Sequence, residues 1–130
     1  MTDDSVGVTA LHQIAQNADD LDRAVVFYRD VLGLRFIARF DPPGLAFFDL
    51  GATRLLLEEN APSTILYLRV EDIDAAFASL RERGVITEGE PHVIHVDEDG
   101  QFGEAGGADW MAFFRDSEDN LLALVTRKPA

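Results

Sequence analysis

The stretch DLDRAVVFYRDVLGL, residues 20–34, decides the fold of this chain. Its apolar positions repeat at the spacing of one helix face: Leu21, Ala24, Val25, Tyr28, Val31 and Leu32. Asp19 or Asp20 can cap the start of such a helix, and Gly33 can close its end. The stretch therefore predicts an amphipathic helix with defined ends.

Strand-like segments surround this helix, and the same order then begins again. In the first half, the predicted strands are Leu11–Ala18, Leu34–Phe40, Leu45–Leu50 and Arg54–Glu58, with turns at Pro42-Pro43-Gly44 and Gly51. In the second half, the strand Thr64–Val70 precedes a helix that begins at Asp72 and stops at Gly84. The strands expected after it are Pro91–Val96, Trp110–Arg115 and Leu121–Thr126. Each half therefore reads β-α-β-β-β.

The two halves also match letter by letter. Asp20-Leu21-Asp22 corresponds to Asp72-Ile73-Asp74 at an offset of 52, and Ala46-Phe47-Phe48 corresponds to Ala112-Phe113-Phe114 at an offset of 66. The second offset is larger because the second half contains extra residues, and these lie in the acidic, glycine-rich stretch Asp97–Ala108. We expect this stretch to be a mobile loop that covers part of the molecule.

Length and composition limit the size and class of the protein. The 130 residues, 14.3 kDa with 47% hydrophobic residues, can bury one core, so we expect one domain over residues 1–130. The two modules are expected at about 8–60 and about 63–128. Without cysteine, the chain has no disulfide, thiolate metal site or cysteine nucleophile.

The charge balance excludes several kinds of partner. Eleven Lys and Arg against 24 Asp and Glu give a net charge of -13, so we expect neither nucleic acid nor an anionic membrane as a partner. No apolar run approaches the ~20 residues that span a bilayer. The acidic N-terminus is also unlike a signal peptide, so we expect a cytoplasmic protein.

The choice of basic residues raises the question of a halophilic source. Lys128 is the only lysine, whereas there are ten arginines, and carboxylates are spread along the whole chain. Such a surface suits a protein in high salt, where self-repulsion is screened. GC-rich codon usage also favours arginine over lysine, and both explanations stay open.

The helix motif of residues 20–34, repeated in weaker form as Val70-Glu71-Asp72-Ile73 with a helix ending at Gly84, resembles the vicinal oxygen chelate superfamily. Its members include glyoxalase I, extradiol dioxygenases, methylmalonyl-CoA epimerase and the bleomycin-resistance proteins. The resemblance covers about Leu11 to Thr126. It implies an α+β fold in which two βαβββ modules pair into a curved, partly open eight-stranded sheet around a cleft.

The resemblance also implies a homodimer, with modules paired either within one chain or between chains. In metal-dependent members, four ligands come from the first and last strands of each module. The matching positions here are Gln13, Leu56 (or Leu57), Ile65 and Ala123. Three of these side chains have no lone pair to offer a cation. We therefore expect neither the usual metal site nor another cofactor.

One alternative keeps a divalent metal. If the first strand were shifted by one residue, His12 would take the place of Gln13. His12, Glu58 and His92 would then be the candidate ligands.

Strand alternation selects the residues that face the predicted cleft. In the fifth strand, Tyr67 and Arg69 lie opposite the fully apolar face. Arg69 either pairs with a carboxylate, such as Asp49, or binds an anionic ligand. Trp110 either packs in the core or forms an aromatic wall with Tyr67.

The register of the first strand decides which way its polar residues face. Gln13 faces the cleft in the favoured register, and this register puts His12 and Gln16 on the face against the helix. His12 is then either a hydrogen-bonded structural residue or, in the shifted register, a ligand-facing one. His92 and His95 fall on opposite faces of a regular strand.

The sequence thus predicts a protein that binds a small organic molecule in the cleft, in the manner of the bleomycin-resistance proteins. The candidate ligand-binding residues are Gln13, Tyr67, Arg69, Trp110, His12 and His92. The alternative is a metal-dependent lyase, isomerase or dioxygenase with a non-standard site. No catalytic residue is assigned, because no histidine is paired with an orienting carboxylate by spacing.

Overall fold

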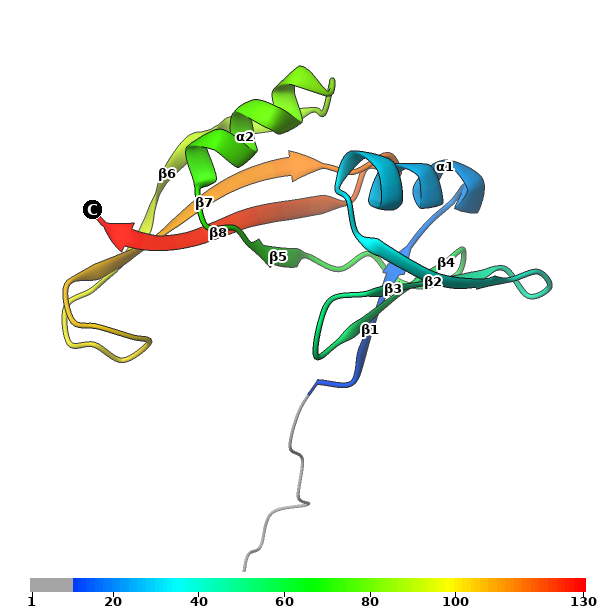
Figure 1. The fold of residues 1–130 in the computed structure, drawn as a ribbon, viewed down its shortest axis with the longest axis horizontal. Coiled ribbons are helices and arrows are strands. Elements are labelled where there is room, and N and C mark those ends of the chain that lie inside the picture. The colour runs from blue at the N-terminus through cyan, green and yellow to red at the C-terminus, as the bar shows by residue number, and fades with distance from the viewer. Residues whose placement is uncertain (1–10) are drawn as a thin grey trace, which may run out of the picture.

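The computed structural model describes residues 11–130, which form two β-α-β-β-β modules (Figure 1). The first module contains β1 (Gln13–Asn17), α1 (Leu21–Val26), η1 (Phe27–Val31), β2 (Arg35–Phe40), β3 (Leu45–Asp49) and β4 (Arg54–Glu58). The second contains β5 (Leu66–Arg69), α2 (Ile73–Glu82), β6 (Thr87–Asp97), β7 (Gly107–Arg115) and β8 (Leu121–Pro129). The predicted duplication and the α+β class are confirmed.

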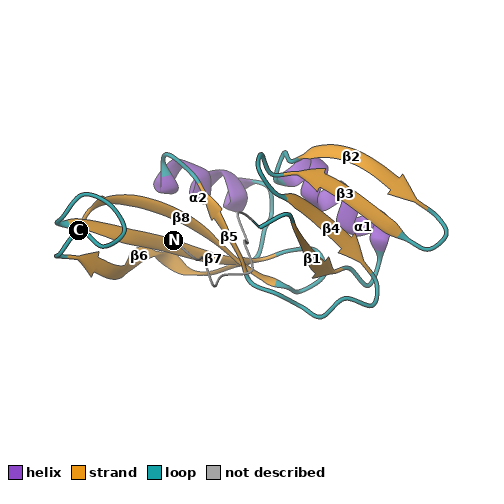
Figure 2. Ribbon diagram, turned by 90° about the horizontal axis from the view of Figure 1, so that it is seen from below, coloured by secondary structure: helices purple, strands orange, loops and turns teal. Residues whose placement is uncertain are grey.

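Each module builds its own four-stranded sheet. The strand orders are β1-β4-β3-β2 and β5-β8-β7-β6. In both sheets the first strand pairs in parallel with the last one, and the other pairs are antiparallel. The helices lie on the same side of the two sheets, which leaves the opposite sheet faces uncovered (Figures 1 and 2). We call these uncovered faces the open face.

The helix of the fold-deciding stretch begins and ends as predicted. Asp20 caps it, because its carboxylate accepts a hydrogen bond from the backbone N–H of Arg23 at 3.1 Å. The last turn widens into the π-helical segment η1, and Gly33 then adopts a φ of 75°, which favours glycine. No helix within residues 11–130 is both long and apolar enough to cross a membrane.

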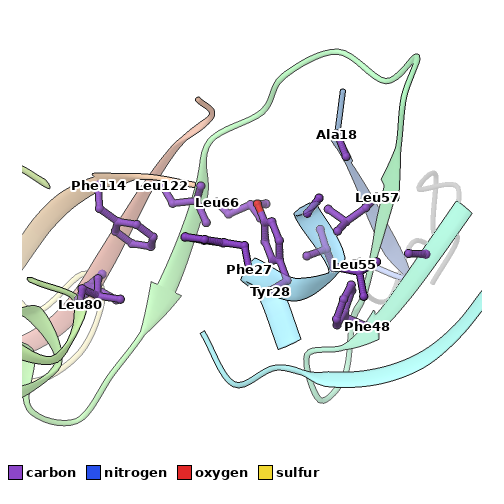
Figure 3. Packing of buried hydrophobic residues seen from close by; sticks show 14 of the residues in the cluster. Ala18, Phe27, Tyr28, Phe48, Leu55, Leu57, Leu66, Leu80, Phe114 and Leu122 are labelled. Carbon is purple, nitrogen blue, oxygen red and sulfur yellow. The ribbon is translucent and has the colours of Figure 1, made fainter. Parts of the chain in front are cut away.

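The core joins the two modules. Phe27 and Tyr28, at the start of η1, lie between Phe48 and Leu55 of the first module and Leu66 of the second (Figure 3). All of these side chains are buried. Burial of large apolar side chains is the main stabilising contribution to such a contact.

A polar junction accompanies this core. The Tyr28 hydroxyl donates to Asp116 Oδ2 at 2.6 Å, and the backbone N–H groups of Glu118 and Asn120 donate to Asp116 Oδ1. Asn120 Nδ2 in turn donates to the backbone carbonyl of Asn17 at 2.7 Å. Burial and the neighbouring Asp116 carboxylate raise the pKa of Tyr28, so its hydroxyl stays protonated and can donate.

A second polar link between the modules is an ion pair. Arg23 Nε lies 2.6 Å from Glu118 Oε2, and the fully buried Glu118 side chain also accepts from the backbone N–H of Asp20. Burial alone would raise the pKa of Glu118. The Arg23 guanidinium and the Asp20 N–H together lower this pKa by more than burial raises it, so it lies below its usual value.

The last three strands are longer than the sequence predicts. The apolar pattern ends at Val96 and Thr126, but backbone pairing continues to Asp97↔Gly107 and Gly107↔Pro129. An alternating pattern reports which side chains are buried, whereas strand pairing depends on backbone groups. The exposed end of this sheet therefore carries no alternating signal.

Candidate ligand-binding groove

The open face carries Gln13, as the favoured register predicts. Gln13 pairs with Arg54 across β1 and β4, and its Oε1 accepts hydrogen bonds from Arg54 Nε and Nη2 at 3.1 and 3.0 Å. Gln16 points to the opposite, helix-covered side and is fully buried. Its amide is satisfied there, because it donates to the carbonyl of Thr64 and accepts from the Thr64 N–H.

His12 lies beside the same arginine as Gln13. Its Nε2 is 3.1 Å from Arg54 Nη2, and the Arg54 guanidinium also lies 5.6 Å from the centre of the Phe47 ring. Sequence reasoning missed Arg54. The signal was present in the alternation of β4, where Arg54 shares a face with Leu56 and Glu58.

The residues at the family's metal-ligand positions do not fit a metal ion. Leu56 and Ala123 are buried and apolar, Ile65 is 46% exposed, and the Gln13 oxygen already accepts from Arg54. Only one of the four positions carries a donor atom, whereas structural and catalytic sites need at least three protein ligands. No reaction step through a metal can be derived from these side chains.

The alternative ligand set is not brought together either. His12 contacts Arg54 at the start of β4, whereas Glu58 lies at the end of that strand. At the usual rise per residue, the backbone positions of Arg54 and Glu58 are about 13 Å apart. His92 lies in β6 of the other module. Within residues 11–130, no three His, Asp or Glu side chains gather closely enough to hold a metal ion.

The prediction that His92 and His95 lie on opposite faces is wrong. An irregularity between Val93 and His95 shifts the register, so that His92 pairs with Met111 and His95 with Asp109. Both partners lie on the open face, and directly paired residues share a face. Both histidines therefore lie there, and the His92 ring is 6.3 Å from the ring of Phe113.

Trp110 and Tyr67 do not form a common aromatic wall. Trp110 packs against the core on the helix-covered face, where its indole N–H donates to the carbonyl of Pro129 at 3.2 Å. Lys128 Nζ lies 4.5 Å above the indole ring. Tyr67 pairs with Ala123 and is 57% exposed on the other face.

A groove of about 650 Å³ runs between the two modules. It lies along the free edge of β5, between the end of η1 and one side of α2. Its apolar walls include Leu32, Leu34, Leu50, Leu68, Leu80 and Leu124. The groove thus offers a large apolar surface that the fold leaves uncovered.

Five polar residues are among those that line this groove: Thr53, Tyr67, Arg69, Ser79 and Arg83. Tyr67 and Arg69 border it from the edge strand β5, where their side chains belong to the open face. The expected pair between Arg69 and Asp49 is absent, because Asp49 pairs with Arg35 at 3.3 Å instead. Within residues 11–130, the Arg69 guanidinium forms no hydrogen bond or ion pair with another residue. Arg69 is solvent-exposed, so water can solvate its guanidinium, and the anionic ligand stays a prediction.

The glycine-rich stretch after β6 is built around one buried carboxylate. Asp97 is 1% exposed and accepts from the N–H groups of Gln101 and Phe102 and from Arg127 Nη2, at 2.8, 2.9 and 2.7 Å. The Phe102 N–H, with the Gln101 N–H and the Arg127 guanidinium, lowers the pKa of Asp97 to about 2. Phe102 itself is 73% exposed. Sequence reasoning missed this anchoring of the loop.

Two βαβββ modules, each with its own four-stranded sheet, and a groove between them define a duplicated α+β protein. The chain belongs to the Glyoxalase/Bleomycin resistance protein/Dioxygenase superfamily, which its residues 10–124 match. This membership confirms the resemblance read from residues 20–34.

Known proteins resemble this chain in sequence or in fold. The uncharacterized protein YraH of Bacillus subtilis is 29% identical over 135 residues, covering 88% of this chain and 95% of YraH. A lactoylglutathione lyase from Agrobacterium tumefaciens superposes with a TM-score of 0.71 at 24% identity, covering 92% of this chain and 94% of the lyase. TnmS3, an antibiotic binding protein from Streptomyces sp. CB03234, gives 0.69 at 23% identity, with 97% and 100% covered. At these identities, the two structures show the fold alone.

Proposed function

We propose that this protein binds a small organic molecule in the groove between its modules. The observation that carries the proposal is the groove itself, which encloses about 650 Å³ and is lined by leucines and five polar residues. Sites for small molecules are typically apolar clefts of about 300–1,000 Å³ with a few placed polar groups. The groove matches this description in volume and in composition.

We propose further that this binding needs no metal ion. The four positions that would hold a metal supply one donor, and that donor is engaged by Arg54. Polarisation of a substrate by a metal is the chemistry on which the family's lyases, isomerases and dioxygenases would depend. The residues present therefore favour a binding role over these enzyme classes, and TnmS3 is a precedent for such a role on this fold.

A fluorescent apolar probe can test the proposal before the ligand is known. Phenylnaphthylamine is neutral, aromatic and small enough for the groove. We expect chelator-treated protein to bind it saturably, with one molecule per chain. The near-ultraviolet circular dichroism of the protein should remain that of a fully folded core. A partly unfolded state also binds apolar probes, but it loses this signal.

A matched pair of variants locates the bound probe. Ser79 lines the groove, whereas its neighbour Ala78 on α2 is exposed and lies outside it. Ser79→Trp should fill the groove and weaken phenylnaphthylamine binding at least about tenfold, which is about 1.4 kcal/mol. Ala78→Trp adds the same indole to the same helix and should leave the affinity unchanged. Equal affinity in both variants would contradict the proposal, as would the absence of saturable binding.

A further inference from the structure

The groove differs in charge from the rest of the molecule. The chain has 24 Asp and Glu among 130 residues, or about one residue in five. The fifteen residues that line the groove include two arginines and no carboxylate. A groove in so acidic a protein would ordinarily contain two or three carboxylates at that frequency. Its lining therefore has a local positive charge within a molecule of net charge -13.

The pattern of ion pairs singles out the same place. Of the 11 Lys and Arg side chains, eight lie within ion-pair distance of a carboxylate: Arg23, Arg29, Arg35, Arg39, Arg81, Arg115, Arg127 and Lys128. Among residues 11–130, the other three cations, Arg54, Arg69 and Arg83, have no carboxylate partner. Arg69 and Arg83 line the groove, and Arg54 directly follows the lining residue Thr53.

The two groove arginines are held in different ways. Arg83 Nη1 donates to the backbone carbonyls of Val31 and Asp30 at 3.0 and 3.4 Å, which fixes its side chain at the end of η1. These carbonyls carry no net charge, so the positive charge of Arg83 is not neutralised. Arg69 projects from the edge strand β5 without a partner among the described residues.

Uncompensated guanidinium groups beside an apolar wall select one class of ligand. A guanidinium binds a carboxylate or sulfonate through parallel hydrogen bonds, while the apolar wall can take the hydrophobic part of the same molecule. The hydroxyl of Ser79 can donate a further hydrogen bond to an anion, whereas the hydroxyl of Thr53 already donates to the backbone carbonyl of Leu11 at 2.9 Å. A cation would meet the arginines with no carboxylate to offset the repulsion.

We infer that the groove's ligand is an organic anion, with one acidic group that meets Arg69 and Arg83 and an aromatic or aliphatic body that packs on the leucines. This inference rests on the proposed function and specifies the class of molecule that the groove takes. The rest of the surface repels anions at long range. Selectivity for an anion must therefore come from the groove itself.

A pair of probes with the same apolar body separates charge from shape. Anilinonaphthalene sulfonate carries the aromatic body of phenylnaphthylamine together with one sulfonate group. We expect the protein to bind the sulfonate about tenfold more tightly than the neutral probe, as one charge-assisted interaction can provide. Arg69→Gln should remove this preference and leave the affinity for the neutral probe unchanged.

Arg81→Gln is the matched control for charge. Arg81 also lies on the second module, pairs with Glu90 at 3.1 Å and lies outside the groove. Arg81→Gln changes the net charge by the same amount as Arg69→Gln. Because Arg81 lies outside the groove, this variant should preserve the preference for the sulfonate. A similar loss in both variants would mean that the anion responds to the overall field, and it would overturn the inference.

The remaining outcomes distinguish the inference from the proposed function. If the neutral probe binds in the groove and the sulfonate binds no more tightly, the inference is wrong and the proposed function stands. If neither probe binds saturably, both are wrong. If Arg69→Lys retains part of the preference that Arg69→Gln loses, the arginine charge acts directly on the anion.

Discussion

Tyr28 and Asp116 join the two modules by a hydrogen bond of 2.6 Å inside the core. Tyr28→Phe removes the donor and leaves Asp116 Oδ2 with the Asn120 amide as its hydrogen-bond partner. We predict that this change lowers the free energy of unfolding by about 1–3 kcal/mol, because a buried acceptor loses a partner. Urea unfolding followed by circular dichroism measures it. Tyr67→Phe, at a 57% exposed tyrosine, is the control and should have little effect.

We also propose that the modules unfold together, since this bond and the shared core cross between them. A single unfolding transition in both proteins is then expected. Two separate transitions, or a Tyr28→Phe protein as stable as its parent, would contradict this account of the junction.

Asp97 gives the molecule a defined response to acid. Its pKa of about 2 in the folded state lies below the unfolded value of about 3.9. The charged carboxylate therefore stabilises the fold above about pH 4, and this stabilisation is lost as the pH falls towards 2. The difference in unfolding free energy between the parent protein and Asp97→Asn should shrink over that range. A constant difference from pH 5 to pH 2 would show that ionisation of Asp97 contributes nothing.

At the scale of residues, the sequence predicts on which face of a sheet a side chain lies, but not with which residue it pairs. Alternation placed Gln13, Tyr67 and Arg69 on the open face, and the structure agrees with all three. It could not tell that Asp49 prefers Arg35 to Arg69, because the two arginines lie in different modules. Partner choice depends on the packing of the modules, which no local pattern contains.

At the scale of elements, the loop between β6 and β7 depends on space around Arg127. A Cβ atom added at Gly107 would lie 2.7 Å from Arg127 Nε, so the guanidinium would have to move away. Gly107→Ala should therefore weaken the contact between Arg127 and Asp97 and destabilise the fold by about 1–3 kcal/mol, as overpacking usually does. Thermal or urea unfolding measures this loss.

A double variant tests the cause. In an Arg127→Ala background, the space at Gly107 is free, and the added methyl group should have little further effect. An equal penalty in both backgrounds would show that the strand and not the arginine rejects the methyl group.

The elements also show where a periodic pattern stops being informative. The helix of residues 20–34 was predictable, because its capping residue, apolar face and closing glycine all agree. In β6, the register shift between Val93 and His95 puts His92 and His95 on one face, although a regular strand would separate them. Such a bulge leaves no mark in the sequence that alternation alone can detect.

For the whole molecule, we propose a homodimer. Exposed apolar side chains lie on the edge strands of the sheets: Phe36, Ile37 and Phe40 on β2, and Ile94 and Val96 on β6. Edge strands with exposed apolar side chains tend to pair with another chain. Light scattering should give about twice the chain mass of 14.3 kDa. A monomeric mass at micromolar concentration would overturn this proposal.

The net charge of -13 leads to a separate prediction about salt. If the acidic surface is an adaptation to high salt, lowering the salt from molar to millimolar concentration should lower the unfolding temperature, because self-repulsion is then no longer screened. Differential scanning calorimetry over a salt series measures the change. An unfolding temperature that does not depend on salt would favour codon usage as the origin of the arginine-rich, lysine-poor composition.

The arrangement of the whole molecule was the least predictable level. Repetition in the sequence predicted two modules, but the groove between them depends on how η1, α2 and β5 meet. Its residues come from segments that are far apart in the chain, and several of them, such as Leu50 and Leu80, read as ordinary core positions. Only the assembled modules show that these side chains border an open groove.

Amide chemical-shift mapping of chelator-treated protein with phenylnaphthylamine tests the central claim most directly. We predict that the largest shifts fall on the groove, at residues 32–34, 67–70 and 79–83. Binding without added metal would then place a small molecule between the modules. Largest shifts on the open face around Phe47, Leu56 and Phe113, or no shifts until a metal is added, would contradict the account.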